Sequence, residues 1–149
     1  MSEWHGRLNR IVAGQQEKPR LVEILKTPDI IRWSTGRVET VWSVDRDFFS
    51  ISGSLFGGYF CILADQIASH TAVTVMADDE VPRTVQLTTT FFRPVVAGEL
   101  EIVGTVVNAG KEILTVSVNF NIGEETVAQA QAIISRKKLR IQDANIATR

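Results

Sequence analysis

The chain has 149 residues, which is enough for one domain with a sizeable hydrophobic core. With 44% hydrophobic residues, 22% charged residues and a net charge of −1, its composition is that of an ordinary globular protein and excludes the basic excess typical of nucleic-acid-binding proteins. A single cysteine, Cys61, excludes an internal disulfide and suits a reducing compartment. The polar N-terminus has no signal-peptide pattern, so we expect a cytoplasmic protein with one domain over residues 1–149.

Two short helices are expected in an N-terminal extension, residues 1–27. Apolar residues recur at helical spacing within residues 2–14. A second helix is expected from Pro19, which suits a first helical position, to Lys26. Because both helices are short, they need the rest of the protein to hold them in place.

Strand-like segments stand on both sides of a long central apolar segment. Residues 30–34 and 37–44 predict two strands around a Thr35-Gly36 turn. Turn residues separate four later runs, whose spacing suits an antiparallel meander. These later runs are residues 84–92, 100–107, 112–122 and 126–135. The polar residues 137–149 are expected to form a tail.

The central segment, residues 55–77, reads LFGGYFCILADQIASHTAVTVMA. Ser54 is a candidate N-cap for a long helix here. Glycines and polar residues interrupt the apolar stretch, so we do not expect it to span a membrane. Such a helix is apolar nearly all round and needs cover from more than one side, which a curved sheet would supply. The fold class expected is therefore α+β.

Asp65 is the one carboxylate of this central segment, and no other side chain there is formally charged if His70 is neutral. An unpaired ionised group in a buried, apolar helix is costly. We therefore expect Asp65 to have a function.

Three stretches of the sequence resemble the hotdog-fold acyl-CoA thioesterases. They are SLFGGYFCILADQIA, TVQLTTTFFRPVVAGELEIVGTVV and GKEILTVSV, within residues 36–136. They are similar in particular to the branch related to phenylacetate-pathway and 4-hydroxybenzoyl-CoA thioesterases. The resemblance implies a hotdog fold, in which a curved antiparallel sheet wraps a long helix, and a homodimer or an assembly of such dimers. It also implies an acyl-CoA substrate and no cofactor beyond the coenzyme A of that substrate.

Thioester hydrolysis needs donors for the carbonyl oxygen, a base for water and a pocket for the acyl group. Free N–H groups of Gly57 and Gly58 at a helix start suit the oxygen. Asp65 is the candidate base or nucleophile, and Ser69, four residues later on the same helical face, is a candidate to orient it. The resemblance implies that a hydroxyl near Thr84 helps to hold the water.

The spacing of the glycine pair and the acid predicts a shared active site. Gly57 and Asp65 are eight residues apart, or about 12 Å along a helix axis. Attack on one thioester requires the donor and the acid within a few ångströms of the same carbon. If both act on one substrate, they come from different chains of a two-fold dimer with two equivalent sites.

Two residues depart from the family pattern. Phe56 precedes the glycine pair where many relatives carry His, and Ser50 stands where some carry Asn. Both changes remove polar groups near the carbonyl, and Phe56 becomes a candidate wall of the acyl pocket. They keep open the alternative of a non-catalytic acyl-CoA binding or sensing protein.

Further substrate-binding candidates are a threonine and several basic residues. Thr88, expected on the same strand face as Thr84, is one of them. The candidates for the phosphates of coenzyme A are Arg93, Lys111, Arg136 and Lys137. Ordinary solvated surface is the alternative for these basic residues.

The remaining chemistry-bearing residues favour no second site. Cys61 shares a helical face with Asp65, but His70 lies about 140° round the helix from that acid, which disfavours a nucleophile–base set. For the same reason His70 is poorly placed for a hotdog dehydratase. Two histidines and one cysteine at unrelated spacing predict no metal site.

Overall fold

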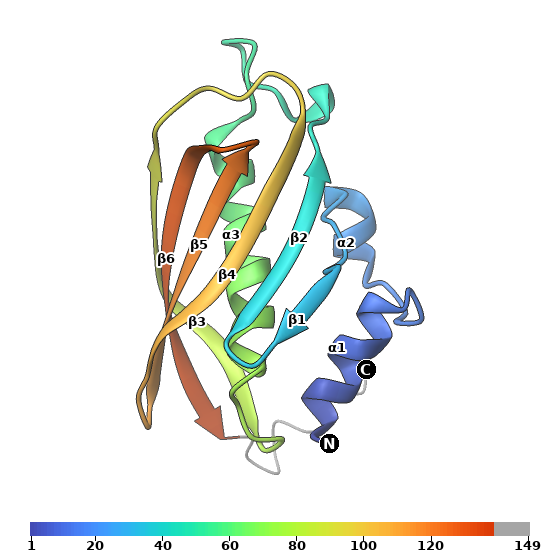
Figure 1. Cartoon of the computed structure of the whole chain (residues 1–149), viewed down its shortest axis with the longest axis vertical. Helices are drawn as coiled ribbons and strands as arrows, with labels where there is room; N and C mark the ends of the chain where they lie inside the picture. Colours follow the sequence, from blue (N-terminus) through green and yellow to red (C-terminus); the bar gives the residue numbers. More distant parts are fainter. Residues whose placement is uncertain (139–149) are drawn as a thin grey trace.

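The computed structural model describes residues 1–138, in which a six-stranded antiparallel sheet curves around one long helix (Figure 1). This arrangement confirms the predicted α+β architecture. In chain order the elements are α1 (Glu3–Val12), α2 (Arg20–Leu25), β1 (Arg32–Ser34), β2 (Arg37–Ser43), the 3-10 turn η1 (Arg46–Phe48), α3 (Gly57–Val73), β3 (Glu80–Phe91), β4 (Glu99–Ala109), β5 (Ile113–Ile122) and β6 (Glu125–Lys138).

The strand order in the sheet is β1-β2-β4-β5-β6-β3, with every neighbouring pair antiparallel. β4, β5 and β6 form the expected meander. The expectation that β3 precedes them in that meander is wrong, because β3 pairs with β6 at the edge of the sheet. The connection from β3 to β4, residues 92–98, contains Pro94 and is too long for a tight hairpin, so the chain crosses to the far side of β5 and β6.

The core lies between α3 and the concave face of the sheet. Leu63 and Ile67 of α3 are fully buried, as are Ile102 of β4 and Val118 of β5. Gly104 of β4 permits the closest approach, because a Cβ there would overlap the hydroxyl of Thr71 and lie 2.9 Å from the Ile67 side chain. The sheet thus covers one face of α3 and leaves its other face to different neighbours.

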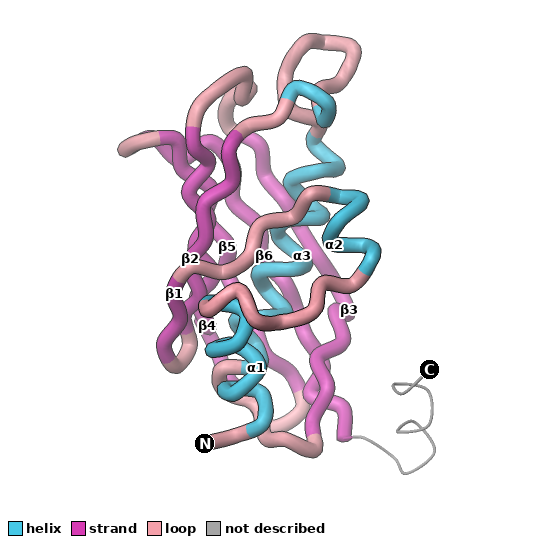
Figure 2. The backbone as a smooth tube through the Cα atoms, turned by 90° about the vertical axis from the view of Figure 1, so that its right-hand side faces the viewer, coloured by secondary structure: helices cyan, strands magenta, loops and turns pink. Residues whose placement is uncertain are grey.

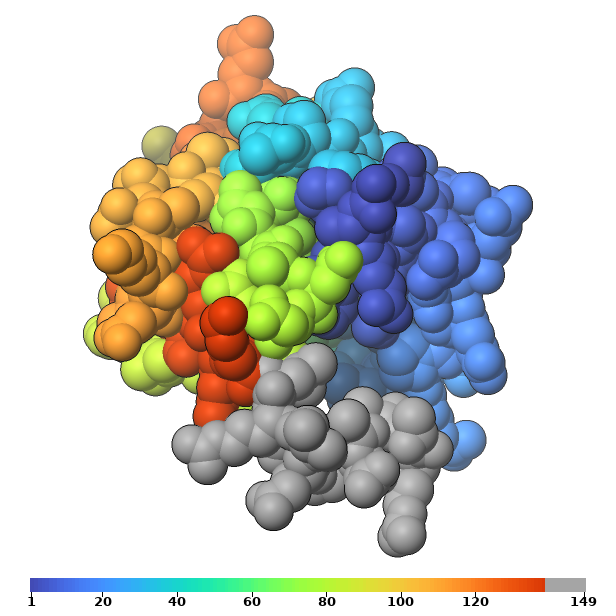
Figure 3. Space-filling model, turned by 90° about the horizontal axis from the view of Figure 1, so that it is seen from below, coloured from blue at the N-terminus to red at the C-terminus, as the bar shows by residue number. Residues whose placement is uncertain are grey.

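The two N-terminal helices lie together along one side of the molecule, next to α3 (Figure 2). Asp78 accepts a hydrogen bond of 2.7 Å from the N–H of Glu3, and the Trp4 indole donates to the Glu80 carbonyl at 3.1 Å. Tyr59 of α3 donates to the Leu25 carbonyl of α2 at 2.7 Å. Seen from the end where β3 begins, the atoms of α1 pack against those of the α3–β3 connection (Figure 3). The main body therefore holds both helices, as expected from their length.

Two local expectations are wrong. The central helix begins at Gly57 with Phe56 at the N-cap position and no side-chain cap, so Ser54 does not cap it. The last strand does not end at residue 135, because β6 extends to Lys138 and includes Arg136 and Lys137. The ion pair of Arg136 with Glu80 holds this end of the strand in place. The rest of the expected tail, residues 139–149, lies outside the described residues. Within residues 1–138, no helix has the length and apolar character needed to cross a membrane.

A mostly buried ion pair joins the start of β3 to the end of β6. The Arg136 guanidinium donates to the Glu80 carboxylate at 2.8 Å, to the Gly110 carbonyl at 3.1 Å and to the Val75 carbonyl at 3.3 Å. The hydrogen bonds that the carboxylate accepts from Arg136 and, to a smaller extent, from the Ala77 N–H hold the pKa of Glu80 below its usual value of 4.5. The pair ties together the segment after α3, the β4–β5 turn and two strands.

Glu80→Gln should lower the free energy of unfolding at pH 7 by about 1–3 kcal/mol, because it weakens charged hydrogen bonds that are largely removed from solvent. Since the pKa of Glu80 is lowered by folding, its contribution is present above pH 4.5 and is lost as the pH falls through the folded-state pKa. Denaturant unfolding at pH 7 and pH 3 measures both effects. Asp79→Asn, which weakens the exposed Asp79–Lys138 pair, is the control and should change little. A Glu80→Gln deficit that is equal at both pH values would contradict this account.

Candidate functional site

The start of α3 presents two backbone N–H groups without acceptors. Among the described residues, no hydrogen bond leads from the N–H of Gly57 or Gly58, and the Tyr59 N–H already turns back to the Phe56 carbonyl at 2.9 Å. Unpaired N–H groups at a helix N-terminus carry partial positive charge. They are therefore suited to an oxygen on which negative charge develops.

Both glycines also permit aromatic rings to lie on the helix start. A Cβ at Gly57 would be 3.2 Å from the Phe91 ring, and one at Gly58 would be 2.5 Å from the Phe56 ring. Close packing against these rings is therefore one reason for glycine at both positions. It leaves the N–H groups unpaired, so the two roles are compatible.

An open groove of about 490 Å³ lies beside this helix start. Four phenylalanines contribute to its wall, and the loop before α3 adds hydroxyl groups, including that of Ser50, which is 2.6 Å from the Ser52 hydroxyl. The residues that line it include Ser50, Ser52, Ser54, Phe56, Gly57, Phe60, Phe91, Phe92 and Arg93. Phe56 and Ser50 thus both border the space next to Gly57.

Asp65 lies two turns further along α3 and is paired with a hydroxyl of β3. The Thr84 Oγ1 donates to Asp65 Oδ1 at 2.6 Å. The expectation that Asp65 is buried is wrong for a single chain, because its side chain lies beside the edge strand β3, where it is exposed. Within the described residues, Asp65 Oδ2 has no hydrogen-bond partner, so the carboxylate keeps one oxygen free for water.

A β-bulge decides which threonines of β3 face α3. Thr84 pairs with Ile134 but Gln86 pairs with Ile133, so Val85 is an extra residue and the alternation of side chains shifts by one. Thr84 consequently faces Asp65, whereas Thr88 lies on the outer face beside Gln86. The prediction that Thr84 and Thr88 share a face is therefore wrong, and Thr88 lies outside this site within its own chain.

Ser69 is not brought to Asp65. No hydrogen bond joins the two side chains in the described part of the chain, although they are one helical turn apart. Ser69 instead lines a cavity of about 210 Å³ between α1, α3 and the start of β3. Helical spacing places Ser69 one turn from Asp65, but the sequence could not indicate that α1 packs beside Ser69.

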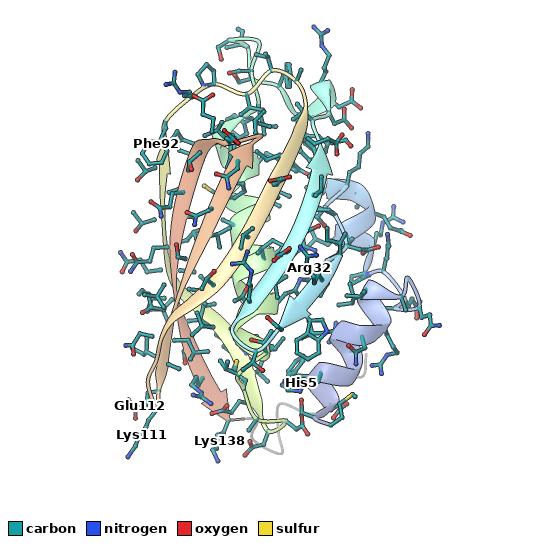
Figure 4. The ribbon with its side chains drawn as sticks, viewed as in Figure 1. His5, Arg32, Phe92, Lys111, Glu112 and Lys138 are labelled. Carbon is teal, nitrogen blue, oxygen red and sulfur yellow. The ribbon has the colours of Figure 1, made fainter. Side chains whose placement is uncertain are left out.

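The basic candidates for coenzyme A phosphates do not form one site within a chain. Phe92, next to Arg93, lies at one end of the molecule and Lys111 at the opposite end (Figure 4). Arg93 is paired with Glu125, and Arg136 with Glu80. Within one chain Arg93 and Lys111 do not meet, because the end of β3 and the β4–β5 turn lie at opposite ends of the sheet. Residues 1–138 contain no cluster of His, Cys, Asp and Glu side chains that could hold a metal ion.

The burial of the His70 side chain was not predicted from the sequence. Its Nδ1 is buried without a hydrogen-bond partner among the described residues. Burial, and to a smaller extent the Arg7 charge, lowers the pKa of His70 to about 4, although the Asp29 charge acts in the opposite direction. The imidazole is therefore neutral at pH 7. Its helical position alone gave no signal, since the cover comes from α1.

Comparison with known proteins identifies the family. Residues 52–129 match the thioesterase superfamily, and the chain belongs to it. A comparison with curated protein sequences finds no significant match. Membership of this superfamily supports thioester hydrolysis as the general activity of the chain.

Solved structures of three proteins are similar to this chain. A phenylacetic acid degradation-related protein of Ralstonia eutropha JMP134 is 21% identical, with a TM-score of 0.77 over 87% of this chain and 98% of that one. AziG of S. sahachiroi is 27% identical, with a TM-score of 0.76 over 83% and 100% of the two chains. The thioesterase HI1161 of Haemophilus influenzae is 20% identical, with a TM-score of 0.74 over 80% and 83%. These similarities agree with the hotdog fold expected from the sequence.

The buried His70 should make the protein less stable in acid. Since its folded-state pKa is about 4 and its usual value is 6.5, the unfolded chain binds a proton that the folded chain does not between these pH values. The free energy of unfolding should therefore fall between pH 6.5 and 4, by up to about 3 kcal/mol from this residue. His70→Asn should remove that part of the slope in denaturant titrations. An unchanged slope in the variant would show that His70 titrates normally.

Proposed function

We propose that this protein hydrolyses an acyl-CoA thioester to the free acid and coenzyme A. The observation that carries the proposal is the Asp65 carboxylate, which is exposed on α3, fixed at one oxygen by Thr84 and free at the other. The same helix begins with unpaired N–H groups beside an aromatic groove. A base for water and donors for a carbonyl oxygen are the two groups that this reaction needs.

The reaction would take place between two chains. Because Gly57 and Asp65 are eight residues apart on one continuous helix, about 12 Å separates them along its axis. β3 is an edge strand. Two of its apolar side chains are exposed: Val85 at 64% and Phe91 at 50%. An exposed edge with apolar side chains favours pairing with a second copy. A two-fold dimer through β3 would bring the start of one α3 towards the partner subunit's Asp65.

In such a dimer the thioester oxygen would accept hydrogen bonds from the N–H groups of Gly57 and Gly58. The partner subunit's Asp65 would take a proton from water while the water oxygen attacks the carbonyl carbon. The C–S bond then breaks, the acid is released and the proton passes to the coenzyme A thiolate. Direct attack by the carboxylate, followed by hydrolysis of the anhydride, gives the same products. The Phe56 and Phe91 rings would exclude bulk water from the donors.

Asp65→Asn should lower kcat at least 100-fold, because the amide cannot accept the proton of water. Thiol release from a panel of acyl-CoA substrates measures the loss. Asp79→Asn makes the same chemical change at an exposed position and should leave turnover unaltered. Unchanged turnover in a folded Asp65→Asn protein would remove the mechanism.

Thr84→Val should lower kcat about tenfold, since the hydrogen bond that fixes a charged carboxylate is lost. Thr84→Ser keeps the donor and should retain most activity. Thr88→Val is the matched control, because it makes the same change on the same strand but on the outer face. Equal losses in Thr84→Val and Thr88→Val would mean that the effect is structural.

A non-catalytic acyl-CoA binding protein is the second candidate. Position 56 carries a phenylalanine, whose ring lies against Gly58, in place of the histidine of many relatives. The loss of that polar side chain favours binding over turnover. Calorimetry separates the two candidates: heat of binding without thiol release supports the sensor, and thiol release that depends on Asp65 supports the enzyme.

A further inference from the structure

Two open grooves share Phe56 at the start of α3. The larger one, of about 490 Å³, borders Gly57, and the smaller one, of about 250 Å³, extends from Phe56 to the end of α2. Phe56 and Ser50 line both grooves. The Phe56 ring also lies against Gly58, so the unpaired N–H groups stand where the two grooves meet. A thioester carbonyl held by these donors would therefore have one groove for each of its two arms, the acyl group and the thiol.

The smaller groove is largely apolar, and hydrogen bonds and ring stacking fix its wall. The residues that line it are Leu25, Asp47, Phe48, Phe49, Ser50, Phe56, Tyr59 and Ile62. The Tyr59 ring stacks on Phe48, with 4.2 Å between the ring centroids, and the Tyr59 hydroxyl donates to the Leu25 carbonyl at 2.7 Å. Because this hydroxyl is already paired, the groove offers an occupant mainly apolar surface.

Negative charge at the edge of the smaller groove disfavours an anionic occupant. Asp47 is the one charged residue among the described residues that line it. Lys26 pairs with Asp47 at 3.1 Å and also with Asp45 at 3.0 Å, so one cation is shared between two carboxylates and the cluster stays negative. A phosphate or carboxylate placed there would be repelled and would lose water beside the phenylalanine rings. The groove therefore suits an uncharged acyl group and not the phosphates of coenzyme A.

The larger groove suits the polar thiol arm of the substrate. Ser50, Ser52 and Ser54 contribute hydroxyl groups to its wall, and Arg93 contributes a guanidinium. Pantetheine carries amide and hydroxyl groups and ends in phosphates, and such groups form hydrogen bonds with serine hydroxyls and a guanidinium. The pair of Arg93 with Glu125 is exposed, so an incoming phosphate can replace the carboxylate at little cost. The two grooves thus differ in polarity and give the substrate one direction.

We propose that the substrate lies across Phe56, with an uncharged alkyl acyl group in the smaller groove and the pantetheine arm in the larger one. The inference rests on the proposed thioester hydrolysis and adds the orientation and class of its substrate. On the scale of a cavity of about 150 Å³ that holds one benzene molecule, about 250 Å³ takes a chain of about ten carbons. Phe56 and Leu25 are here specificity residues that touch the acyl group and take no part in bond breaking. Leu25 and Phe48 precede the residues matched by the superfamily, 52–129, so this chain's own N-terminal part completes the groove.

The kinetic test compares octanoyl-CoA with palmitoyl-CoA and with suberoyl-CoA, whose acyl group has the length of octanoyl and a terminal carboxylate. Wild-type kcat/KM should be at least tenfold higher for octanoyl-CoA than for either of the others. The palmitoyl chain exceeds the groove, and the suberoyl carboxylate meets apolar rings and the charge of Asp47. Equal kcat/KM for octanoyl-CoA and suberoyl-CoA, or a preference for palmitoyl-CoA, would overturn the proposal.

Two substitutions and a matched control test which residues bound the acyl group. Leu25→Trp fills the groove from α2 and should lower the ratio of kcat/KM for octanoyl-CoA to that for butyryl-CoA at least tenfold. Leu21→Trp, on the same helix but 65% exposed and outside the groove, should leave this ratio unaltered. Phe56→Ala joins the two grooves and should raise kcat/KM for palmitoyl-CoA relative to octanoyl-CoA. Because each ratio is measured on one protein sample, partial unfolding does not change it. A wild-type ratio in Leu25→Trp would overturn the proposal.

A binding test keeps the inference separate from the activity. S-octyl-CoA, a thioether that is not hydrolysed, and coenzyme A are added separately to the ¹³C,¹⁵N-labelled protein. The octyl chain should give nuclear Overhauser effects to the methyl groups of Leu25 and Ile62, whereas coenzyme A should shift the amide signals of Ser52 and Ser54. Octyl contacts at Ser52 and Ser54 instead, or no binding of either probe, would overturn the orientation even if the protein is an active thioesterase. Octyl contacts at Leu25 and Ile62 in a protein that releases no thiol would refute the enzyme and keep the groove.

Discussion

The packing of α3 into the curved sheet is the constraint on which the other features depend. Its buried face is filled by side chains such as Leu63 and Ile67, and Gly104 lets the helix approach β4 closely. This packing fixes the rotation of the helix about its axis, because any other rotation would expose the apolar face. Asp65 is consequently held beside the edge strand β3, and the free N–H groups of the first turn are held beside the groove.

The edge strand β3 contributes the side chain that orients Asp65. The bulge at Val85 turns Thr84 towards Asp65 while the rest of β3 keeps its pairing with β6. Without the bulge, Thr84 would lie on the same face of β3 as Gln86 and Thr88, which is the outer face of the sheet. One irregularity of the backbone therefore supplies the hydrogen bond that orients the carboxylate.

The sequence allowed the element order and the position of the central helix to be predicted, because apolar periodicity and turn residues are local signals. The edge position of β3 and the bulge at Val85 could not be predicted, since both depend on pairing with β6, which lies far away in sequence. Asp65 was found from its isolation in an apolar segment, but its exposure was not. The cavity between α1, α3 and the start of β3, which Ser69 and His70 both line, could not be predicted because α1 and α3 meet only in the folded chain.

The central claim is that the helix start of one chain and Asp65 of another form one site, and a subunit-mixing experiment tests it most directly. Asp65→Asn and Gly57→Val chains, each inactive alone, are unfolded together, refolded and assayed for thiol release. In a mixed dimer with shared sites, one site carries both defects and the other carries none, so about a quarter of wild-type activity should return at equal mixing. If each site lay within one chain, every chain would carry a defect, and the mixture would stay as inactive as its components.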